Sequence, residues 1–114
     1  MFESDYNLKK IKKIITSVTN IKMYVTPRYI DHYINNEYEK FSIQIIKQIL
    51  KKGKGFVDIG AHYGYYSLIA NQVIKKNKII AIEPVKENFT ILKKNFKLNN
   101  IKNFKLINAA ASDF

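Results

Sequence analysis

Two acidic residues and two glycines have the types and spacing of a cofactor site. Asp58, Gly60 and Gly64 lie in the segment FVDIGAHYGYYSL, and Glu83 ends the next apolar stretch. A glycine turn between a strand and a helix lets a ligand approach the backbone, and the N-terminus of the helix offers free N–H groups. An acid at the end of the second strand can accept hydrogen bonds from the hydroxyls of a ribose. The pattern predicts a site for a cofactor that contains a nucleoside.

The spacing narrows the choice of cofactor. A dinucleotide turn needs Gly-x-Gly-x-x-Gly, but Asp58 stands two residues before Gly60. Its negative charge would repel a pyrophosphate and attract an ammonium group. A ligand with an amine, a carboxylate and a ribose fits better, and S-adenosylmethionine is such a ligand. In the alternative interpretation both glycines only tighten the turn, and Glu83 is a surface acid.

The elements that would position these residues alternate between strand and helix. Apolar runs predict strands over residues 56–59, 78–83 and 104–110, and helical periodicity predicts helices over 65–75 and 84–98. Two consecutive strand–helix–strand connections imply an α/β fold with a parallel sheet in the strand order 3-2-1. The acids and the glycine turn then meet at the carboxyl ends of the strands.

The first part of the chain reads as helical. Apolar residues within 8–18 recur at helical spacing, and a second helix is expected over 39–52. An amphipathic helix that covers the core is favoured over one that lies on a membrane surface. We therefore expect a helical N-terminal segment over residues 1–37 and an α/β unit over residues 38–114.

Composition limits the class of protein. The 114 residues include 20 Lys+Arg and 9 Asp+Glu, a net charge of +11, and 46% are hydrophobic, which is too apolar for a disordered chain. There is no cysteine, so disulfides, thiolate metal sites and cysteine nucleophiles are excluded, and no metal site is expected. No apolar run approaches the roughly 18 residues of a membrane span. The chain start lacks a signal-peptide pattern, so a cytoplasmic protein is expected.

The positive charge does not by itself identify a partner. Nineteen of the twenty basic residues are lysine, spread along nearly the whole chain, and only Arg28 is arginine. Proteins that read phosphate or guanine usually use the arginine fork, so nucleic acid is not the expected partner. A solvated lysine surface is favoured over a surface that attracts an anionic partner.

Several motifs stand in the order found in a known family. They are DIGAHYGYY at 58–66, Glu83-Pro84, Glu87-Asn88-Phe89 and NAAASD at 108–113. With these motifs, residues 38–114 resemble the first half of a class I S-adenosylmethionine-dependent methyltransferase, in particular the FkbM type. The resemblance implies a Rossmann-like methyltransferase sheet.

The resemblance also implies roles for individual residues. Asp58 would hold the methionine amine, and Gly60 and Gly64 would let the methionine part approach the backbone. Glu83 would bind the ribose hydroxyls. The other implied cofactor-binding residues are Ala61, His62, Pro84, Val85, Asn108, Ala109 and Ala110. For His62, where the family commonly has asparagine, a supporting role is favoured over that of a general base; His32 is expected to be structural, and Asp113 either borders the site or closes a turn.

The implied function is O-methylation of a hydroxyl on a small molecule or glycan. Members of that family continue with further strands, whereas this chain stops after the third, so a truncated or fragmentary methyltransferase is expected. Its isolated chain should not transfer methyl groups, and its first strand should pair with a chain that supplies the missing strands. Two alternatives stay open: a non-catalytic interaction module derived from a methyltransferase, and an RNA-binding or RNA-modifying protein.

Overall fold

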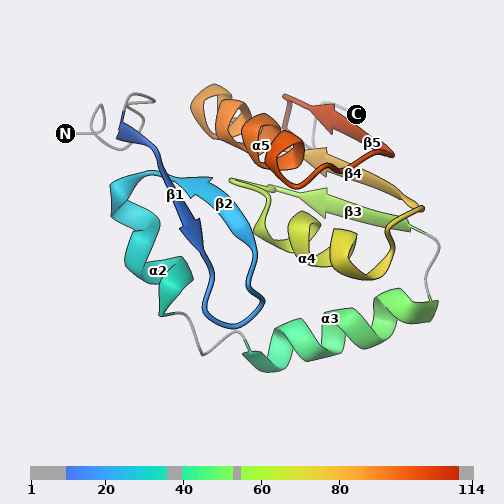
Figure 1. Cartoon of the computed structure of the whole chain (residues 1–114). Coiled ribbons are helices and arrows are strands. Elements are labelled where there is room, and N and C mark those ends of the chain that lie inside the picture. The colour runs from blue at the N-terminus through green and yellow to red at the C-terminus, as the bar shows by residue number, and fades with distance from the viewer. Residues whose placement is uncertain (1–9, 36–39, 53–54, 111–114) are drawn as a thin grey trace.

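A parallel sheet forms the centre of the protein (Figure 1). The computed structural model describes residues 10–35, 40–52 and 55–110. The strands follow the order β3-β4-β5, and their bounds are β3 (Gly55–Ile59), β4 (Lys78–Ile82) and β5 (Phe104–Ile107). The connecting helices are α4 (Tyr65–Val73) and α5 (Lys86–Leu98). Both strand pairs are parallel, as the two strand–helix–strand connections predict.

The third strand is shorter than predicted. It ends at Ile107 instead of residue 110, because the next side chain bends back across the sheet end. The Asn108 amide Nδ2 donates hydrogen bonds to the carbonyl oxygens of Glu83 (2.8 Å) and Pro84 (3.1 Å). The ends of β4 and β5 are therefore tied together at the edge where the site was predicted.

The N-terminal segment differs from the helix that the sequence predicted. Residues 11–18 do not form the predicted helix: β1 (Lys12–Ile15) pairs antiparallel with β2 (Lys22–Val25). Side chains alternate, since Ile14 is buried and Ile15 is 56% exposed. Asn20 adopts the left-handed conformation in the connecting turn, with φ 54°. The β-branched residues here favour a strand. The apolar positions that fit one face of a helix also fit a strand with alternating side chains, so the spacing did not distinguish the two.

Helical structure follows the hairpin, and the predicted helix over 39–52 is present in it. A 3-10 turn η2 (Pro27–Tyr29) leads into the short helix α2 (Ile30–Ile34), and α3 (Lys40–Lys52) comes before the sheet. Figure 1 shows the hairpin and α2 near the end of the sheet to which the arrow of β3 points. Hairpin residues share one hydrophobic core with the α/β unit.

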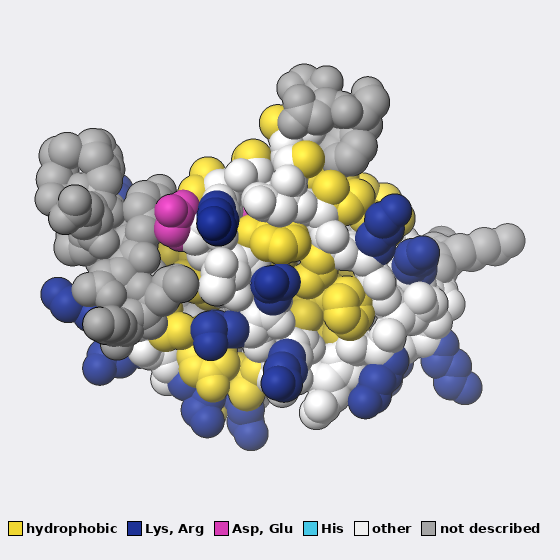
Figure 2. Space-filling view, turned by 90° about the horizontal axis from the view of Figure 1, so that it is seen from above, with side chains coloured by type: hydrophobic (Ala, Val, Ile, Leu, Met, Phe, Trp, Pro, Cys, Tyr) yellow, Lys and Arg dark blue, Asp and Glu magenta, His cyan; other side chains and the backbone are white. Residues whose placement is uncertain are grey.

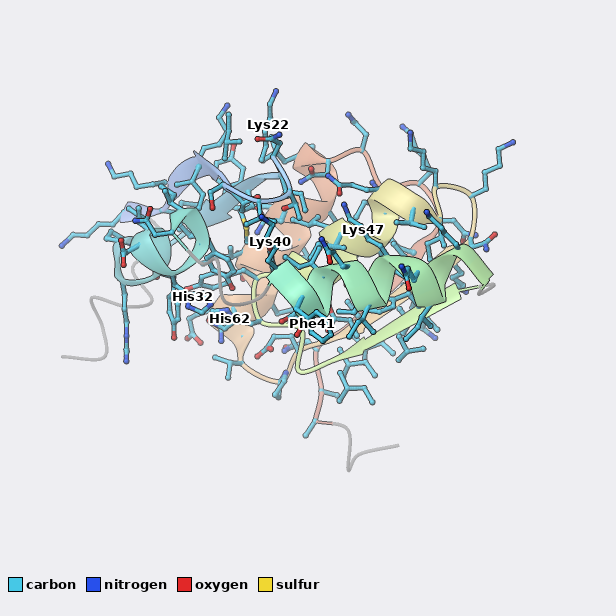
Figure 3. All side chains as sticks on the ribbon, turned by 90° about the horizontal axis from the view of Figure 1, so that it is seen from below. Lys22, His32, Lys40, Phe41, Lys47 and His62 are labelled. Carbon is cyan, nitrogen blue, oxygen red and sulfur yellow. The ribbon has the colours of Figure 1, made fainter. Side chains whose placement is uncertain are left out.

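One edge of the sheet carries exposed apolar side chains. Among the described residues, β3 pairs only with β4, and Val57 and Ile59 of β3 are 56% and 64% exposed. The neighbouring helix α3 packs on α4 but leaves Phe41 72% exposed (Figure 3). None of the helices in the described part of the chain has the length and apolar character to span a membrane.

Candidate functional site

The glycine turn follows β3 in an unusual backbone conformation. Gly60, His62 and Gly64 all have positive φ, at 69°, 55° and 90°. Such angles are strained for residues with a side chain, so the two glycines suit the turn and His62 is an exception. The N–H of Ala61 donates to the carbonyl oxygen of Ile82 at 2.9 Å. This bond holds the turn against the end of β4.

Glu83 connects the turn with the segment after β4. Its carboxylate accepts hydrogen bonds from the backbone N–H groups of His62 (2.7 Å) and Val85 (2.9 Å), one on each oxygen. The side chain is only 4% exposed, so its orientation is fixed. Each carboxylate oxygen keeps a further lone pair. Glu83 can therefore bracket the turn and still accept hydrogen bonds from a ligand.

Asp58 faces the first turn of α4. Its Oδ2 accepts a hydrogen bond from the hydroxyl of Ser67 at 2.7 Å, and both residues are buried. Burial raises the pKa of Asp58, hydrogen bonds from Ser67 partly offset that rise, and the charge of Glu83 adds to it. Sequence reasoning missed Ser67, and the only signal for it was a hydroxyl residue in the first turn of the helix after the glycine turn.

Replacing Asp58 with asparagine is expected to stabilise the fold at neutral pH. The folded protein binds the Asp58 proton more tightly than the unfolded chain does, so ionisation of this residue destabilises the fold as the pH rises above 3.8, its ordinary pKa. Asparagine keeps an acceptor for Ser67 without that cost. Urea unfolding at about pH 7 and about pH 3 measures the effect. The gain should be present at the higher pH and shrink at the lower one, and a loss at pH 7 would contradict the assigned cause.

The two glycines of the turn have different surroundings. A Cβ built on Gly64 would lie 2.6 Å from the Leu92 side chain of α5, so this glycine lets the turn pack against the helix. A Cβ on Gly60 would meet nothing within 4 Å. The space beside Gly60 can take a ligand, whereas Gly64 has a packing role that the sequence did not show.

An aromatic wall, defined as Tyr29, His62 and Tyr63, stands beside the turn. The imidazole of His62 stacks on Tyr63 at 3.8 Å between ring centroids, and Tyr29 meets it edge-on at 4.8 Å. The Tyr63 hydroxyl shares a hydrogen bond with Thr26 at 3.0 Å. Sequence reasoning missed Tyr29, because no motif surrounds it and its ring contact with His62 joins positions far apart in the sequence.

The wall keeps His62 partly buried. Burial lowers the pKa of His62; the negative charge of Glu83 opposes that effect, and His32 adds to it. Figure 3 shows the two histidines near one another at the same end of the molecule. His32 also contacts Tyr29 edge-on, with 6.3 Å between ring centroids, so it belongs to the surroundings of the wall.

The other predicted site residues lie around this centre. Pro84 and Val85 are exposed, Ala61 is buried, and Ala109 and Ala110 are partly buried. Hydrogen bonds bring together His62, Glu83, Val85 and Asn108. Asp113 lies outside the described residues.

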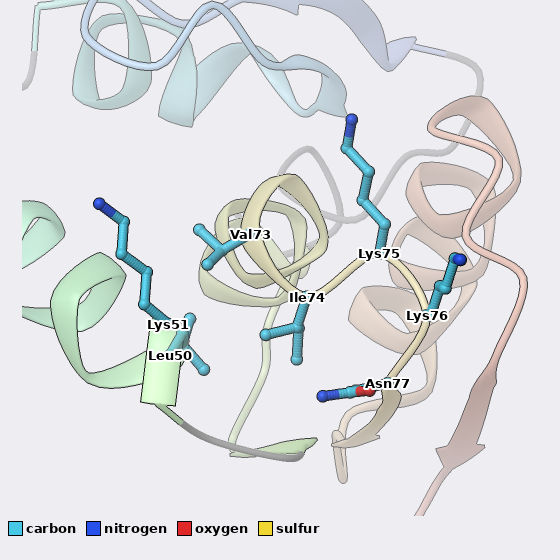
Figure 4. Close-up of a pocket in the computed structure, with 7 residues that line it drawn as sticks. All are labelled: Leu50, Lys51, Val73, Ile74, Lys75, Lys76 and Asn77. Atoms are coloured by element: carbon cyan, nitrogen blue, oxygen red, sulfur yellow. The ribbon is translucent and has the colours of Figure 1, made fainter.

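Three hollows on the described surface lie away from the turn. One of about 400 Å³ is lined by residues of α3, the end of α4 and the connection before β4, namely Leu50, Lys51, Val73, Ile74, Lys75, Lys76 and Asn77 (Figure 4). Because β4 begins right after Asn77, this hollow is at the amino end of the strand, opposite the predicted site. Among the described residues, no group of three or more His, Cys, Asp or Glu could hold a metal ion.

The sheet and the glycine turn place the chain in a known structural class. A transferase structure from Pyrococcus horikoshii has a TM-score of 0.71 and 25% identity over 92% of this chain and 38% of that one. TYW2 of M. jannaschii, in complex with AdoMet, has a TM-score of 0.73 and 19% identity over 92% and 46%. A Pyrococcus abyssi tRNA (uracil-54, C5)-methyltransferase, in complex with S-adenosyl-L-homocysteine, has a TM-score of 0.62 and 10% identity over 85% and 24%. The chain has the α/β fold of S-adenosylmethionine-dependent methyltransferases.

The family is identified by a sequence model. The model described as the Vibrio cholerae RfbT protein matches residues 8–113, and the chain belongs to this family. The match names RfbT, so the FkbM type stays a hypothesis. No curated protein sequence matches the chain. The chain spans less than half the length of each of the three solved structures.

Proposed function

We propose that this chain is the cofactor-binding part of a methyltransferase that uses S-adenosylmethionine. The observation that carries the proposal is the fixed carboxylate of Glu83 beside the open space at Gly60. A carboxylate in that position can accept hydrogen bonds from the two hydroxyls of a ribose. The AdoMet and S-adenosyl-L-homocysteine in two structures of the same fold support this choice of cofactor.

The chain's own residues divide the work of binding. In this proposal Glu83 accepts hydrogen bonds from the ribose hydroxyls, and Asp58 attracts the amine of the methionine part. Gly60 leaves room for that part, and the exposed side chains of Pro84 and Val85 cover the adenine. When bound, the cofactor supplies an activated methyl group on a positively charged sulfur.

The acceptor we propose is a hydroxyl on a small molecule or glycan. This choice rests on the FkbM resemblance of the motifs, and the cytoplasm is the proposed location. RNA is the second candidate, because a tRNA methyltransferase shares the fold. Figure 2 shows lysines scattered among apolar side chains on the face seen from above. A nucleic-acid-binding surface usually has clustered basic residues, so this surface favours the hydroxyl acceptor over RNA.

The partner we propose is a polypeptide segment that adds strands beside β3. Val57 and Ile59 leave this edge apolar and exposed, and a strand edge with free backbone groups is a template for pairing. Methyl transfer needs the acceptor held in line with the sulfur, and positioning is a large part of such a rate. The added segment would supply the walls that the described residues do not.

Titration with S-adenosyl-L-homocysteine tests the proposal. The Glu83→Ala variant should bind about 5- to 150-fold more weakly, the equivalent of about 1–3 kcal/mol for hydrogen bonds to a charged acceptor. Glu87→Ala is the matched control, because it removes the same charge from α5 outside the hydrogen bonds of the turn. Isothermal calorimetry on both variants and the parent measures the affinities. If the parent and the Glu83→Ala variant bound the ligand equally well, Glu83 would only hold the turn in place and would not contact the cofactor.

Transfer RNA binding separates the two acceptor classes. If RNA is the acceptor, the chain should retard tRNA in gel shifts at physiological salt, in a manner that weakens steeply as salt rises. If the acceptor is a hydroxyl on a small molecule or glycan, retardation should vanish at physiological salt, since scattered lysines give weak, unspecific attraction.

A further inference from the structure

The connectivity of the proposed cofactor would place its sulfur near the aromatic wall. This inference rests on the proposed function. In S-adenosylmethionine the sulfur joins the ribose to the carbon chain that carries the amine. With the ribose at Glu83 and the amine at Asp58, the sulfur would lie over the turn between them. His62 is part of this turn, and its own N–H donates to Glu83 at 2.7 Å.

The turn is set apart from the rest of the chain by its charge. Residues 55–74 contain no lysine or arginine, although the whole chain has a net charge of +11. The acids at the site are Asp58 and Glu83, both buried. His62 is therefore the one group within the turn itself that can become positive.

We propose that uncharged His62 lets the site prefer the sulfonium donor over the neutral thioether product, and that a proton on His62 removes this preference. A positive imidazole would repel a sulfonium, whereas it would leave a thioether unaffected. At a separation of about 8 Å and an effective dielectric constant of about 20, this repulsion weakens binding by about tenfold or more. The same side chain would thus favour release of product after each transfer.

The groups that surround His62 keep it uncharged near neutral pH. Burial lowers its pKa below the ordinary value of 6.5, and His32 of α2 acts in the same direction. Glu83 at the end of β4 opposes them. From η2, Tyr29 meets the imidazole edge-on, and the Arg28 guanidinium lies 5.7 Å from the centre of the Tyr29 ring. Tyr63 covers one face of the imidazole.

The test compares two ligands at two pH values. Calorimetry gives the affinities of the full chain for S-adenosylmethionine and S-adenosyl-L-homocysteine at about pH 8 and about pH 5. The two ligands differ only in the methyl group on sulfur and the charge that it brings, so the pH dependence of their affinity ratio reports that charge. The ratio should fall at the lower pH, by up to about tenfold as His62 takes up its proton. A ratio that does not change with pH would overturn the proposal.

The matched control is His62→Asn. Asparagine tolerates a positive φ and carries no charge, so the turn is kept while the titrating group is lost. Its affinity ratio should vary less with pH than that of the parent, because the imidazole is lost while Asp58 and Glu83 titrate in both proteins. An equal fall in parent and variant would assign the effect to the carboxylates and overturn the proposal. Failure of both ligands to bind at either pH would overturn the proposed function itself.

A second measurement does not depend on the variant. By linkage, S-adenosylmethionine should lower the pKa of His62 by about one unit more than the thioether does. Imidazole signals in NMR titrations report this shift, and His32→Asn assigns them, since the chain has only two histidines. Equal His62 shifts with the two ligands would refute the inference even where both bind.

Discussion

Replacement of Asn95 by leucine is expected to destabilise the protein by about 3–5 kcal/mol. Asn95 is fully buried on α5 and bonds to two other elements. Its Oδ1 accepts from the N–H of Tyr24 at 2.5 Å, and its Nδ2 donates to the carbonyl oxygens of Tyr24 (3.0 Å) and Tyr63 (2.8 Å). Leucine has a similar size but removes all three hydrogen bonds, one of them buried and two partly buried, each at about 1–3 kcal/mol.

The control for this substitution is Asn103→Ala. Asn103 also donates a side-chain hydrogen bond to a backbone oxygen, that of Lys76, but at 3.3 Å and exposed to solvent. Its loss should change the free energy of unfolding by no more than about 0.5 kcal/mol. Urea unfolding of both variants measures the difference. If the leucine variant loses as little as the control, Asn95 does not hold the hairpin to the turn.

The α/β part of the fold could be predicted because its signals are local. The apolar run of β4 is buried on both faces, and the change of period after Lys52 separates strand from helix. Glycines at a strand end indicate the turn without any knowledge of distant contacts. These features predicted the parallel pairing and the meeting of Asp58 and Glu83 at the strand ends.

The hairpin could not be predicted in the same way. Its apolar spacing fits a helix as well as a strand, and contacts far away in the sequence decide between them. Asn95 binds both backbone groups of Tyr24 across 71 positions, and Asn99 donates to the carbonyl oxygen of Lys22. Asparagines in a helix show no such partners in the sequence, so neither the hairpin nor Tyr29 in the site was found.

The roles of the two glycines could be assigned only from coordinates. In the sequence Gly60 and Gly64 form one motif and were given one role, close approach of a ligand. The structure separates them, because Leu92 of α5 lies against Gly64 and open space lies beside Gly60. Alanine at these two positions should therefore have different effects on stability and on cofactor affinity, which the sequence spacing alone could not predict.

Alanine at Gly64 is expected to cost about 2–4 kcal/mol of stability, and alanine at Gly60 about 1 kcal/mol. Both positions have positive φ, which costs an alanine about 1–2 kcal/mol, less what it gains through a stiffer unfolded chain. Only at Gly64 would the new methyl group overlap with the buried Leu92 side chain, and such overpacking costs a further 1–3 kcal/mol, roughly. Urea unfolding of the two variants side by side measures the stabilities.

The affinity for the cofactor product should change in the opposite order, with a larger loss in Gly60→Ala than in Gly64→Ala. The Gly60→Ala methyl group projects into the space proposed for the methionine part of the cofactor, so calorimetry should show S-adenosyl-L-homocysteine binding at least about tenfold weaker, the equivalent of about 1.4 kcal/mol. The folded fraction of Gly64→Ala should bind within about threefold of the parent, since its methyl group points into the protein. Unchanged affinity in Gly60→Ala would place the cofactor elsewhere, and equal stability losses would mean that Leu92 moves aside without strain.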